Sequence, residues 1–281
     1  MSTTIEPGDI KLHYVDIAEA RTMPGLRLVL GAYCVPGPWR EACKGLFYVK
    51  GLSYTPVRTA NAGASDLALG MGGTQTELIE WTGQASAPVA VWNDERPRSS
   101  WLDQLNLAER LEPNPPLIPA NVEDRVRMFG MINELASENG VAWLKRLLMV
   151  HGPLTSMPAG AEGRGFFEFL GGKYGYKPEI AQAAAARIAA ILNLFDAQLA
   201  AQKRAGRSYL IGDALTAVDI YWAAFCGLLA PLPPEQCPMA TSFRDGLYGN
   251  DDPQIAAALT PALLAHRDFI YQKHLELPVV F

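Results

Sequence analysis

The chain has 281 residues, of which 49% are hydrophobic and 19% charged, the composition of a globular protein with a sizeable core. Its 24 Lys and Arg against 29 Asp and Glu give a net charge of −5, which disfavours nucleic acid and anionic membrane surfaces as partners. The length predicts two domains.

The start of the chain has neither a basic stretch nor an apolar segment, so we expect no signal peptide. We also expect no membrane span, because no apolar run reads as long enough. The four cysteines lack paired short spacings, which is typical of reduced thiols in a cytoplasmic protein. The four histidines show no metal-ligand spacing, so the sequence predicts no metal site.

The first part of the chain predicts a strand, a helix and a second strand. We expect residues 1–25 to form an N-terminal extension on the surface, because they show little periodicity. Residues 26–32 are a short apolar run that ends near a glycine, as a buried strand does. A helix over residues 39–50 follows Pro38, and proline is favoured at the first helical position. With a second strand over residues 52–57, this unit predicts parallel pairing.

Residues 84–107 carry the strongest functional signal. A strand over residues 89–92 follows Ala87–Pro88, and a proline there suits only an edge strand, a first position or a tight turn. After a polar turn, Ser99 or Ser100 opens a helix, whose free N–H groups would face an anion beside Ser99. A plain hairpin followed by a capped helix is the alternative interpretation.

A proline-rich linker over residues 113–120 precedes a second domain, residues 121–281, which we predict to be all-helical. Asn121 is placed to cap its first helix. The apolar face predicted for that helix consists of Val122, Val126, Phe129, Ile132 and Ala136. The glycine-rich residues 153–175 predict a loop, and Pro178 opens a long helix.

Residues 212–220 contain a capping box, with Thr216 as the N-cap and Asp219 three positions later. The helix that follows is apolar nearly all round, so we expect it to be buried. A buried helix end needs its N–H donors satisfied. We therefore interpret Asp219 as a residue that serves folding rather than as a catalytic acid.

The order of these features resembles the glutathione transferase superfamily over residues 26–230. That family joins an α/β thioredoxin-like domain, here residues 26–112, to an all-α domain. Its cis-proline before the third strand matches Ala87–Pro88, and its buried Ser/Thr-x-x-Asp box matches Thr216 and Asp219. The resemblance implies glutathione as co-substrate, no metal, and a homodimer.

The resemblance also implies which residues contact glutathione. The backbone at Ala87–Pro88 would pair with the cysteinyl part, and Ser99 with its helix N-terminus would hold the γ-glutamyl carboxylate. Gln84 and Trp39 are further candidate contacts. Arg98 departs from the family, which usually has an acid or amide there. The γ-glutamyl amino group would lose its usual partner, while the carboxylate would gain a charge-assisted one.

Two residues are candidates for activating the glutathione thiol. A hydroxyl that donates to sulfur lowers the thiol pKa, and Tyr33 falls where the tyrosine branches of the family carry that hydroxyl. The serine and cysteine branches carry the activating side chain at the position of Gly37. Cys34 is the alternative, as a thiol near a helix N-terminus able to form a mixed disulfide, but it has no resolving cysteine nearby.

The resemblance predicts a glutathione transferase that attacks a small apolar electrophile, held in a pocket between the domains. One alternative is a non-catalytic binding or scaffold protein of the same fold, which Gly37 and Arg98 favour. Another is a thiol transferase that depends on Cys34.

Overall fold

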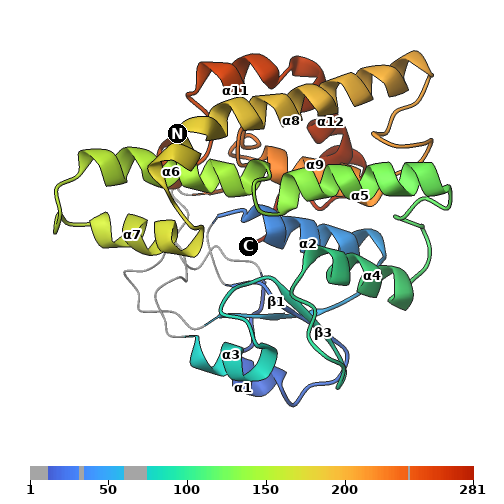
Figure 1. Ribbon diagram of the computed structural model, residues 1–281. Helices are drawn as coiled ribbons and strands as arrows, with labels where there is room; N and C mark the ends of the chain where they lie inside the picture. The colour runs from blue at the N-terminus through green and yellow to red at the C-terminus, as the bar shows by residue number, and fades with distance from the viewer. Residues whose placement is uncertain (1–11, 32–34, 60–74, 240) are drawn as a thin grey trace. The chain divides into compact units, whose positions relative to one another are not determined.

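The structure is a computed structural model that describes residues 12–31, 35–59, 75–239 and 241–281 (Figure 1). The chain forms two compact units. Unit 1 contains Met1–Ile118, Pro231–Gly246 and Ile270–Phe281, and unit 2 contains Pro119–Ala230 and Leu247–Phe269.

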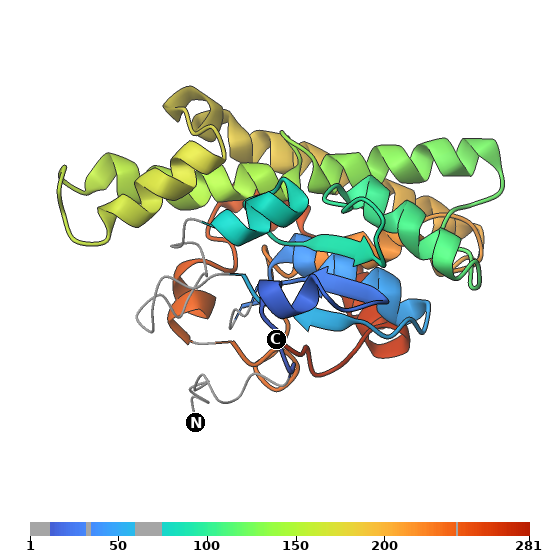
Figure 2. The ribbon, with the colours of Figure 1, turned by 90° about the horizontal axis from the view of Figure 1, so that it is seen from below.

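Unit 1 is built on a sheet of three strands in the order β2-β1-β3, which Figure 2 shows side by side. The central strand β1 (Leu26–Val29) pairs in parallel with β2 (Thr55–Val57) and antiparallel with β3 (Val89–Trp92). All four β1 residues are buried, as expected for an apolar run between two neighbours. The three predicted strands and the parallel pairing of the first two are confirmed.

Unit 1 also contains helices. They are α1 (Ile17–Ala20), α2 (Pro38–Val49), α3 (Thr76–Thr82), α4 (Trp101–Leu111) and α10 (Thr241–Gly246). Pro38 occupies the first turn of α2, as predicted, and Gly51 follows that helix with φ of 64°.

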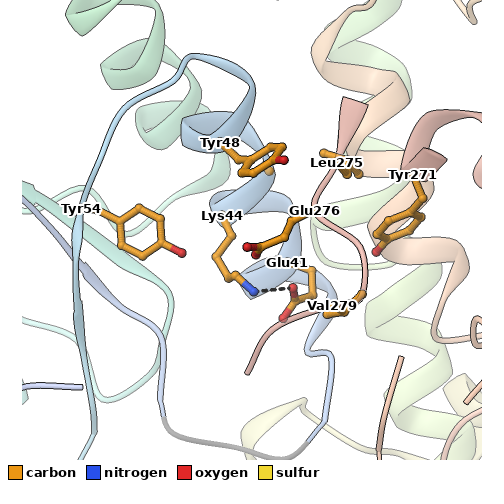
Figure 3. Close-up of a pocket in the computed structure, with 9 residues that line it drawn as sticks. Glu41, Lys44, Tyr48, Tyr54, Tyr271, Leu275, Glu276 and Val279 are labelled. Carbon is orange, nitrogen blue, oxygen red and sulfur yellow. Dashed lines mark hydrogen bonds and ion pairs between the residues drawn. The ribbon is translucent and has the colours of Figure 1, made fainter. Parts of the chain in front are cut away.

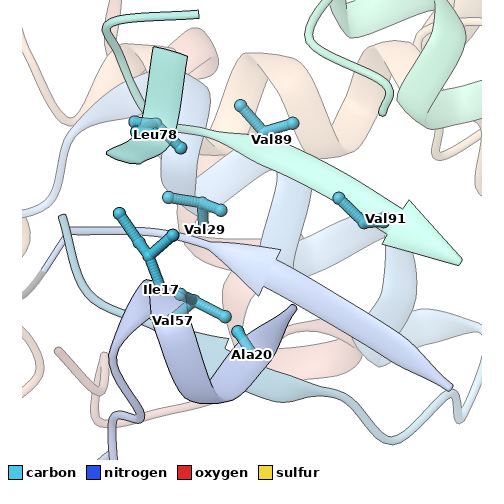
Figure 4. Packing of buried hydrophobic residues seen from close by; sticks show 7 residues of the cluster. All are labelled: Ile17, Ala20, Val29, Val57, Leu78, Val89 and Val91. Atoms are coloured by element: carbon cyan, nitrogen blue, oxygen red, sulfur yellow. The ribbon is translucent and has the colours of Figure 1, made fainter. Parts of the chain in front are cut away.

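The interpretation of residues 1–25 as a surface extension is wrong for the part of it that the structure describes. Val15 forms a parallel bridge to Val57, and α1 places Ile17 and Ala20 in a core cluster, with exposed fractions of 2% and 0%. Figure 4 shows this cluster, which joins α1 to the three strands and to α3. Its members are Ile17, Ala20, Val29, Val57, Leu78, Val89 and Val91. Burial of apolar surface therefore holds the segment on the sheet.

The expected linker is attached to unit 1 for most of its length. Lys50 Nζ donates to the Pro115 carbonyl at 2.7 Å and forms an ion pair with Glu109 at 2.6 Å. The Glu109 carboxylate also accepts from the Leu117 N–H, and Leu117 is fully buried. The division into domains 26–112 and 121–281 stays a prediction, whereas the compact units divide after Ile118 and include two later segments in unit 1.

Unit 2 is helical. Its helices are α5 (Val122–Ala136), α6 (Val141–Ser156), α7 (Arg164–Lys173), α8 (Pro178–Arg204), α9 (Ala217–Cys226), α11 (Pro253–Ala258) and the first part of α12 (Pro261–His274). Helix α6 packs against α7 and α8, and α5 packs against α9 (Figure 1). Asn121 caps α5 and Pro178 lies in the first turn of α8, as predicted.

The predicted apolar face of α5 is wrong at its first turns, because Val122 and Val126 are 72% and 66% exposed. Ile132 and Ala136 of the predicted face are buried, as predicted, and the buried side also includes Met128, Met131 and Leu135, which the prediction left out. Met128, Met131, Ile132 and Leu135 have the i, i+3, i+4, i+7 spacing of one helical face.

Residues 153–175 are also not the predicted loop. Helix α6 continues through Pro153 to Ser156, and α7 follows after Gly163. The glycines that suggested a loop have a packing role at Gly171. A Cβ atom there would lie 3.3 Å from both Leu154 Cδ1 and Tyr176 Cβ. Glycine thus lets α7 approach its neighbours closely.

Helix α8 is long and apolar enough to cross a membrane by length and composition, contrary to the expectation from the sequence. A core helix of a soluble protein meets the same two criteria. The side of α8 that carries Ile188, Leu192 and Phe195 is buried within unit 2.

The predicted capping box opens α9, and every residue of that helix is buried. Asp219 Oδ2 accepts from the Thr216 N–H at 3.0 Å and from its hydroxyl at 2.9 Å. Asp219 Oδ1 accepts from the Leu210 N–H at 2.8 Å and lies 2.9 Å from His266 Nε2. One fully buried carboxylate therefore satisfies groups from three separate segments of unit 2.

We predict that Asp219→Ala lowers the free energy of unfolding by about 3 kcal/mol or more, because several buried donors lose their acceptor at once. Asp213→Ala is the matched control, since this nearby carboxylate is 81% exposed and its ion pair with Arg207 contributes little. Urea denaturation of both variants measures the difference. Equal stabilities would contradict the structural role of Asp219.

Candidate functional site

The structure describes most of the residues predicted to bind glutathione, and they lie in unit 1. Tyr33 and Cys34 lie outside the described residues. Trp39 is half-buried in the first turn of α2, and Gln84 is exposed in the turn after α3. The Ala87–Pro88 peptide bond is cis, and β3 begins at the next residue.

One side-chain and two backbone hydrogen bonds hold the polar turn after β3. Asn93 has φ of 45°, and its side-chain oxygen accepts from the Gly25 N–H at 2.8 Å. Further along, the Arg98 N–H donates to the Ala90 carbonyl at 2.8 Å, and the Ala90 N–H donates back at 2.9 Å. The chain after the turn thus pairs with β3 through an isolated bridge.

The Gln104 side chain donates hydrogen bonds to the backbone both before β3 and after the polar turn. Its side-chain N–H group donates to the Pro88 carbonyl at 3.1 Å and to the Arg98 carbonyl at 3.3 Å. The side chain is 2% exposed, so loss of these bonds would leave polar groups unsatisfied in the interior. Gln104 was missed as a site residue, although a lone amide among Leu105 and Ala108 on a buried helix face was a usable signal.

Helix α4 begins beside this junction. Ser100 is its N-cap and accepts from the Asp103 N–H at 3.1 Å, so Ser100 rather than Ser99 opens the helix. Ser99 is exposed one position earlier. The first N–H groups of an α-helix have no acceptor within the helix and favour an anion nearby. The stretch therefore presents a serine hydroxyl and a helix N-terminus together.

The Arg98 side chain braces its own turn. This side chain is 13% exposed, and its guanidinium forms an ion pair with Glu95 at 2.6 Å and donates to the Arg96 carbonyl. Glu95 also pairs with Arg110 at 2.5 Å. Hydrogen bonds and charge from Arg110, and then from Arg98, hold the pKa of Glu95 below its ordinary value.

The cysteines that the structure describes are poor candidates for thiol chemistry. Cys43 lies in the buried part of α2, and burial raises its pKa far above the ordinary value. Burial likewise raises the pKa of Cys226 and of Cys237 to about 12. A thiol is nucleophilic as its thiolate, so none of these three is activated.

A cavity beside α2 is lined by charged and aromatic residues (Figure 3). Glu41 and Lys44 come from α2, Tyr271 comes from α12, and Glu276 comes from the residues after α12. Its volume of about 30 Å³ suits one or two water molecules and is too small for a peptide.

Solved structures with the same fold include glutathione transferases from several organisms. One from Methylobacterium radiotolerans, in complex with glutathione sulfonate, is 14% identical with a TM-score of 0.56, covering 88% of this chain and 91% of its own. One from Methylobacillus flagellatus with glutathione bound is 10% identical with a TM-score of 0.55, covering 88% and 95%. Glutathione transferase Omega 3C from Trametes versicolor is 13% identical with a TM-score of 0.54, covering 92% and 90%.

These similarities show that the chain has the glutathione transferase fold, a thioredoxin-like domain followed by a helical domain, as predicted. No protein-family model and no curated protein sequence matches the chain.

We predict that Glu95→Gln destabilises the protein at neutral pH and that the difference from wild type shrinks in acid. Because the folded-state pKa of Glu95 is lowered, its contribution is present above the ordinary value of 4.5 and is lost as pH falls through the folded-state value. Thermal unfolding at a series of pH values checks this. A difference that stays constant down to the acid limit would contradict the ion-pair role.

We predict that the Cys34→Ser variant reacts negligibly with an aromatic disulfide reagent at pH 8 until it unfolds. Thiols with a pKa of about 12 are ionised to about one part in ten thousand at that pH. Denaturant should then release three thiols. Rapid labelling of the folded variant would show that a described cysteine is reactive, and wild type labelled in parallel reports on Cys34 itself.

Proposed function

We propose that the protein is a glutathione transferase that binds glutathione along residues 84–107. The main support for this proposal is the pair of hydrogen bonds from Gln104 to the Pro88 and Arg98 carbonyls. They hold this backbone together beside Ser99 and the N-terminus of α4. Glutathione is a peptide with carboxylate ends, and such a site offers backbone groups and anion-favouring donors together. Support also comes from glutathione transferases of this fold that were solved with glutathione or glutathione sulfonate bound.

In this proposal the cysteinyl part of glutathione pairs with the backbone at Ala87–Pro88, and the γ-glutamyl carboxylate meets Ser99 and the first N–H groups of α4. Gln84 and Trp39 complete the contacts. The Arg98 guanidinium already pairs with Glu95, so its part is to fix the turn rather than to supply the main charge.

Tyr33 activates the thiol in the enzyme we propose, by donating its hydroxyl hydrogen to the sulfur. That hydrogen bond favours the thiolate and lowers the thiol pKa. The thiolate then attacks a small apolar electrophile in conjugation, thiolysis or isomerisation. Cys34 acting through a mixed disulfide is the second mechanism. From the spacing of the cysteines we also infer a cytoplasmic protein, and from the family resemblance a homodimer.

A non-catalytic glutathione-binding protein is the second candidate function, and Gly37 favours it. Gly37 is the N-cap of α2, where the serine branches of the family carry their activating hydroxyl, and it supplies no side chain. Its φ of −63° suits any residue, and a Cβ atom there would lie 3.8 Å from Arg40 Cβ. A serine would therefore fit at this position.

Calorimetric titration with glutathione tests binding first. We expect Ser99→Ala to weaken the affinity about tenfold, the effect of losing one hydrogen bond to a charged group. Ser53→Ala, a change at an exposed serine elsewhere in unit 1, should leave it unchanged. Absence of binding by the wild-type protein at millimolar glutathione would refute both the enzyme and the glutathione-binding protein.

The thiol pKa of bound glutathione then separates the mechanisms. Tyr33→Phe should raise that pKa and lower kcat about a hundredfold, as loss of one charge-stabilising donor does. Loss of activity in Cys34→Ser instead would identify the thiol transferase. If wild type binds glutathione without turnover and Gly37→Ser gains activity, the protein is the non-catalytic binder.

A further inference from the structure

A cleft in unit 2 has no part in the proposed function. Its volume is about 430 Å³, which is within the range of small-molecule sites. Its walls come from α6, from α7, which lies beside α6 in Figure 1, and from the turn before α8. They include Leu154, Thr155, Glu168, Gly172 and Tyr176. Every residue that lines the cleft belongs to unit 2, so its geometry is set within that unit.

Arg164 joins the two helices that form most of the walls. Its Nη1 donates to the Leu154 carbonyl at 3.0 Å and to the Met157 carbonyl, at the end of α6 where a cation is favoured. Its Nε donates to the Glu168 carboxylate, one turn further along α7, at 2.8 Å. The cleft is therefore formed before a ligand arrives, which keeps the entropic cost of binding low.

Tyr176 and the glycines of α7 give the cleft a flat wall. The Tyr176 N–H donates to the Gly171 carbonyl at 2.8 Å, and its hydroxyl lies 2.9 Å from His151 Nδ1. A Cβ atom at Gly171 would lie 3.3 Å from Tyr176 Cβ, so this side chain packs directly on the backbone of α7. Gly172 likewise places no side chain over the cleft. Such a wall suits an aromatic ring.

Two polar groups of the cleft can accept a hydrogen bond from a ligand. The Thr155 hydroxyl gives its hydrogen to the His151 carbonyl at 2.7 Å, and its oxygen remains an acceptor. The Glu168 side chain is 56% exposed, and a carboxylate that accepts from one guanidinium N–H has lone pairs for a further donor. Because Arg164 balances the charge of Glu168, a charged ligand would gain little.

We propose that this cleft binds a small, uncharged aromatic molecule that carries a hydroxyl group, as phenols and naphthols do. The ring contacts Leu154 and Tyr176 beside the glycine backbone of α7, and the hydroxyl donates to the Glu168 carboxylate. An aromatic alcohol is not an electrophile that a thiolate attacks. The site is therefore additional to the proposed reaction and does not rest on it.

Gly172→Leu tests the site, with Gly165→Leu as the matched control. Both glycines lie within α7, and a Cβ atom at either would meet no atom within 4 Å outside its own part of the helix. Leucine favours a helix more than glycine does, so neither variant should lower the thermal stability. Gly172 lines the cleft and Gly165 does not, so the leucine fills the cleft in Gly172→Leu alone.

Titration with 2-naphthol in the absence of glutathione, followed by naphthyl fluorescence, measures binding. We expect saturable binding to wild type and to Gly165→Leu, and an affinity about tenfold or more weaker in Gly172→Leu, because the leucine occupies the space of the ligand. 2-Methoxynaphthalene has no hydrogen to donate and should bind wild type about tenfold more weakly than 2-naphthol. Glu168→Ala should remove most of that difference.

Equal affinities of wild type and folded Gly172→Leu for 2-naphthol would overturn the site, as would the absence of saturable binding to wild type. Equal affinities of wild type for the two naphthalenes would also overturn it, and this comparison needs no variant. Titration of Gly172→Leu with glutathione separates the two proposals. Residues 84–107 lie in unit 1, so glutathione affinity should match that of wild type, whether or not 2-naphthol binds.

Discussion

The candidate site depends on one buried amide, the side chain of Gln104. It donates to the carbonyls of Pro88 and Arg98, and so joins the residue before β3, the turn after β3 and α4. A backbone turn on a surface has many conformations of similar energy, and fixing them costs entropy. Burying the amide favours the hydrogen-bonded arrangement, because breaking these bonds would leave buried polar groups without partners. The exposed donors at Ser99 and α4 are positioned as a consequence.

Both units use a buried carboxylate in a related way. Asp219 in unit 2 accepts hydrogen bonds from the segment before α9 and contacts His266 after it, and Glu41 in unit 1 accepts from two cations on its own helix. A buried charge is tolerated only when its lone pairs are filled, so each carboxylate specifies which segments must meet. Apolar packing supplies most of the free energy of folding without this directional requirement. The hydrogen bonds of these carboxylates thus add a directional requirement that apolar packing lacks.

Local patterns predicted the elements whose causes are local. The strand at residues 89–92, the prolines that open α2 and α8, and the Thr216–Asp219 box follow from periodicity, backbone geometry and capping, which act over a few residues. The face of α5 was missed because its apolar residues allow two stripes, and only tertiary packing selects the one with Met128 and Met131. Helix α7 was missed because glycines are typical of loops, whereas Gly171 lies in a helix where a Cβ atom would come within 3.3 Å of Leu154 and Tyr176.

The site itself was predictable in outline but not in its supporting contacts. Ala87–Pro88 and the serines before α4 are adjacent in sequence, so local reasoning found them. The pairing of Lys44 with the Val280 carbonyl joins residues 236 positions apart, and no short-range pattern encodes it. Charged residues are rarely buried, so the residue types gave no sign that Arg40, Glu41 and Lys44 would be. Only the return of the chain to α2 buries them.

The ion pairs around Arg98 change the effect that its positive charge would have on a bound ligand. Considered alone, an arginine in place of an acid would reverse the charge presented to the γ-glutamyl group. In the folded protein Glu95 lies 2.6 Å from its guanidinium and is itself shared with Arg110, so the turn keeps its own charge balance. The backbone of Arg98 meanwhile pairs with Ala90 and bonds to Gln104, contacts that do not depend on the side chain. An anion at this site would therefore be selected by Ser99 and the helix N-terminus, and the departure at residue 98 is compatible with the binding mode proposed.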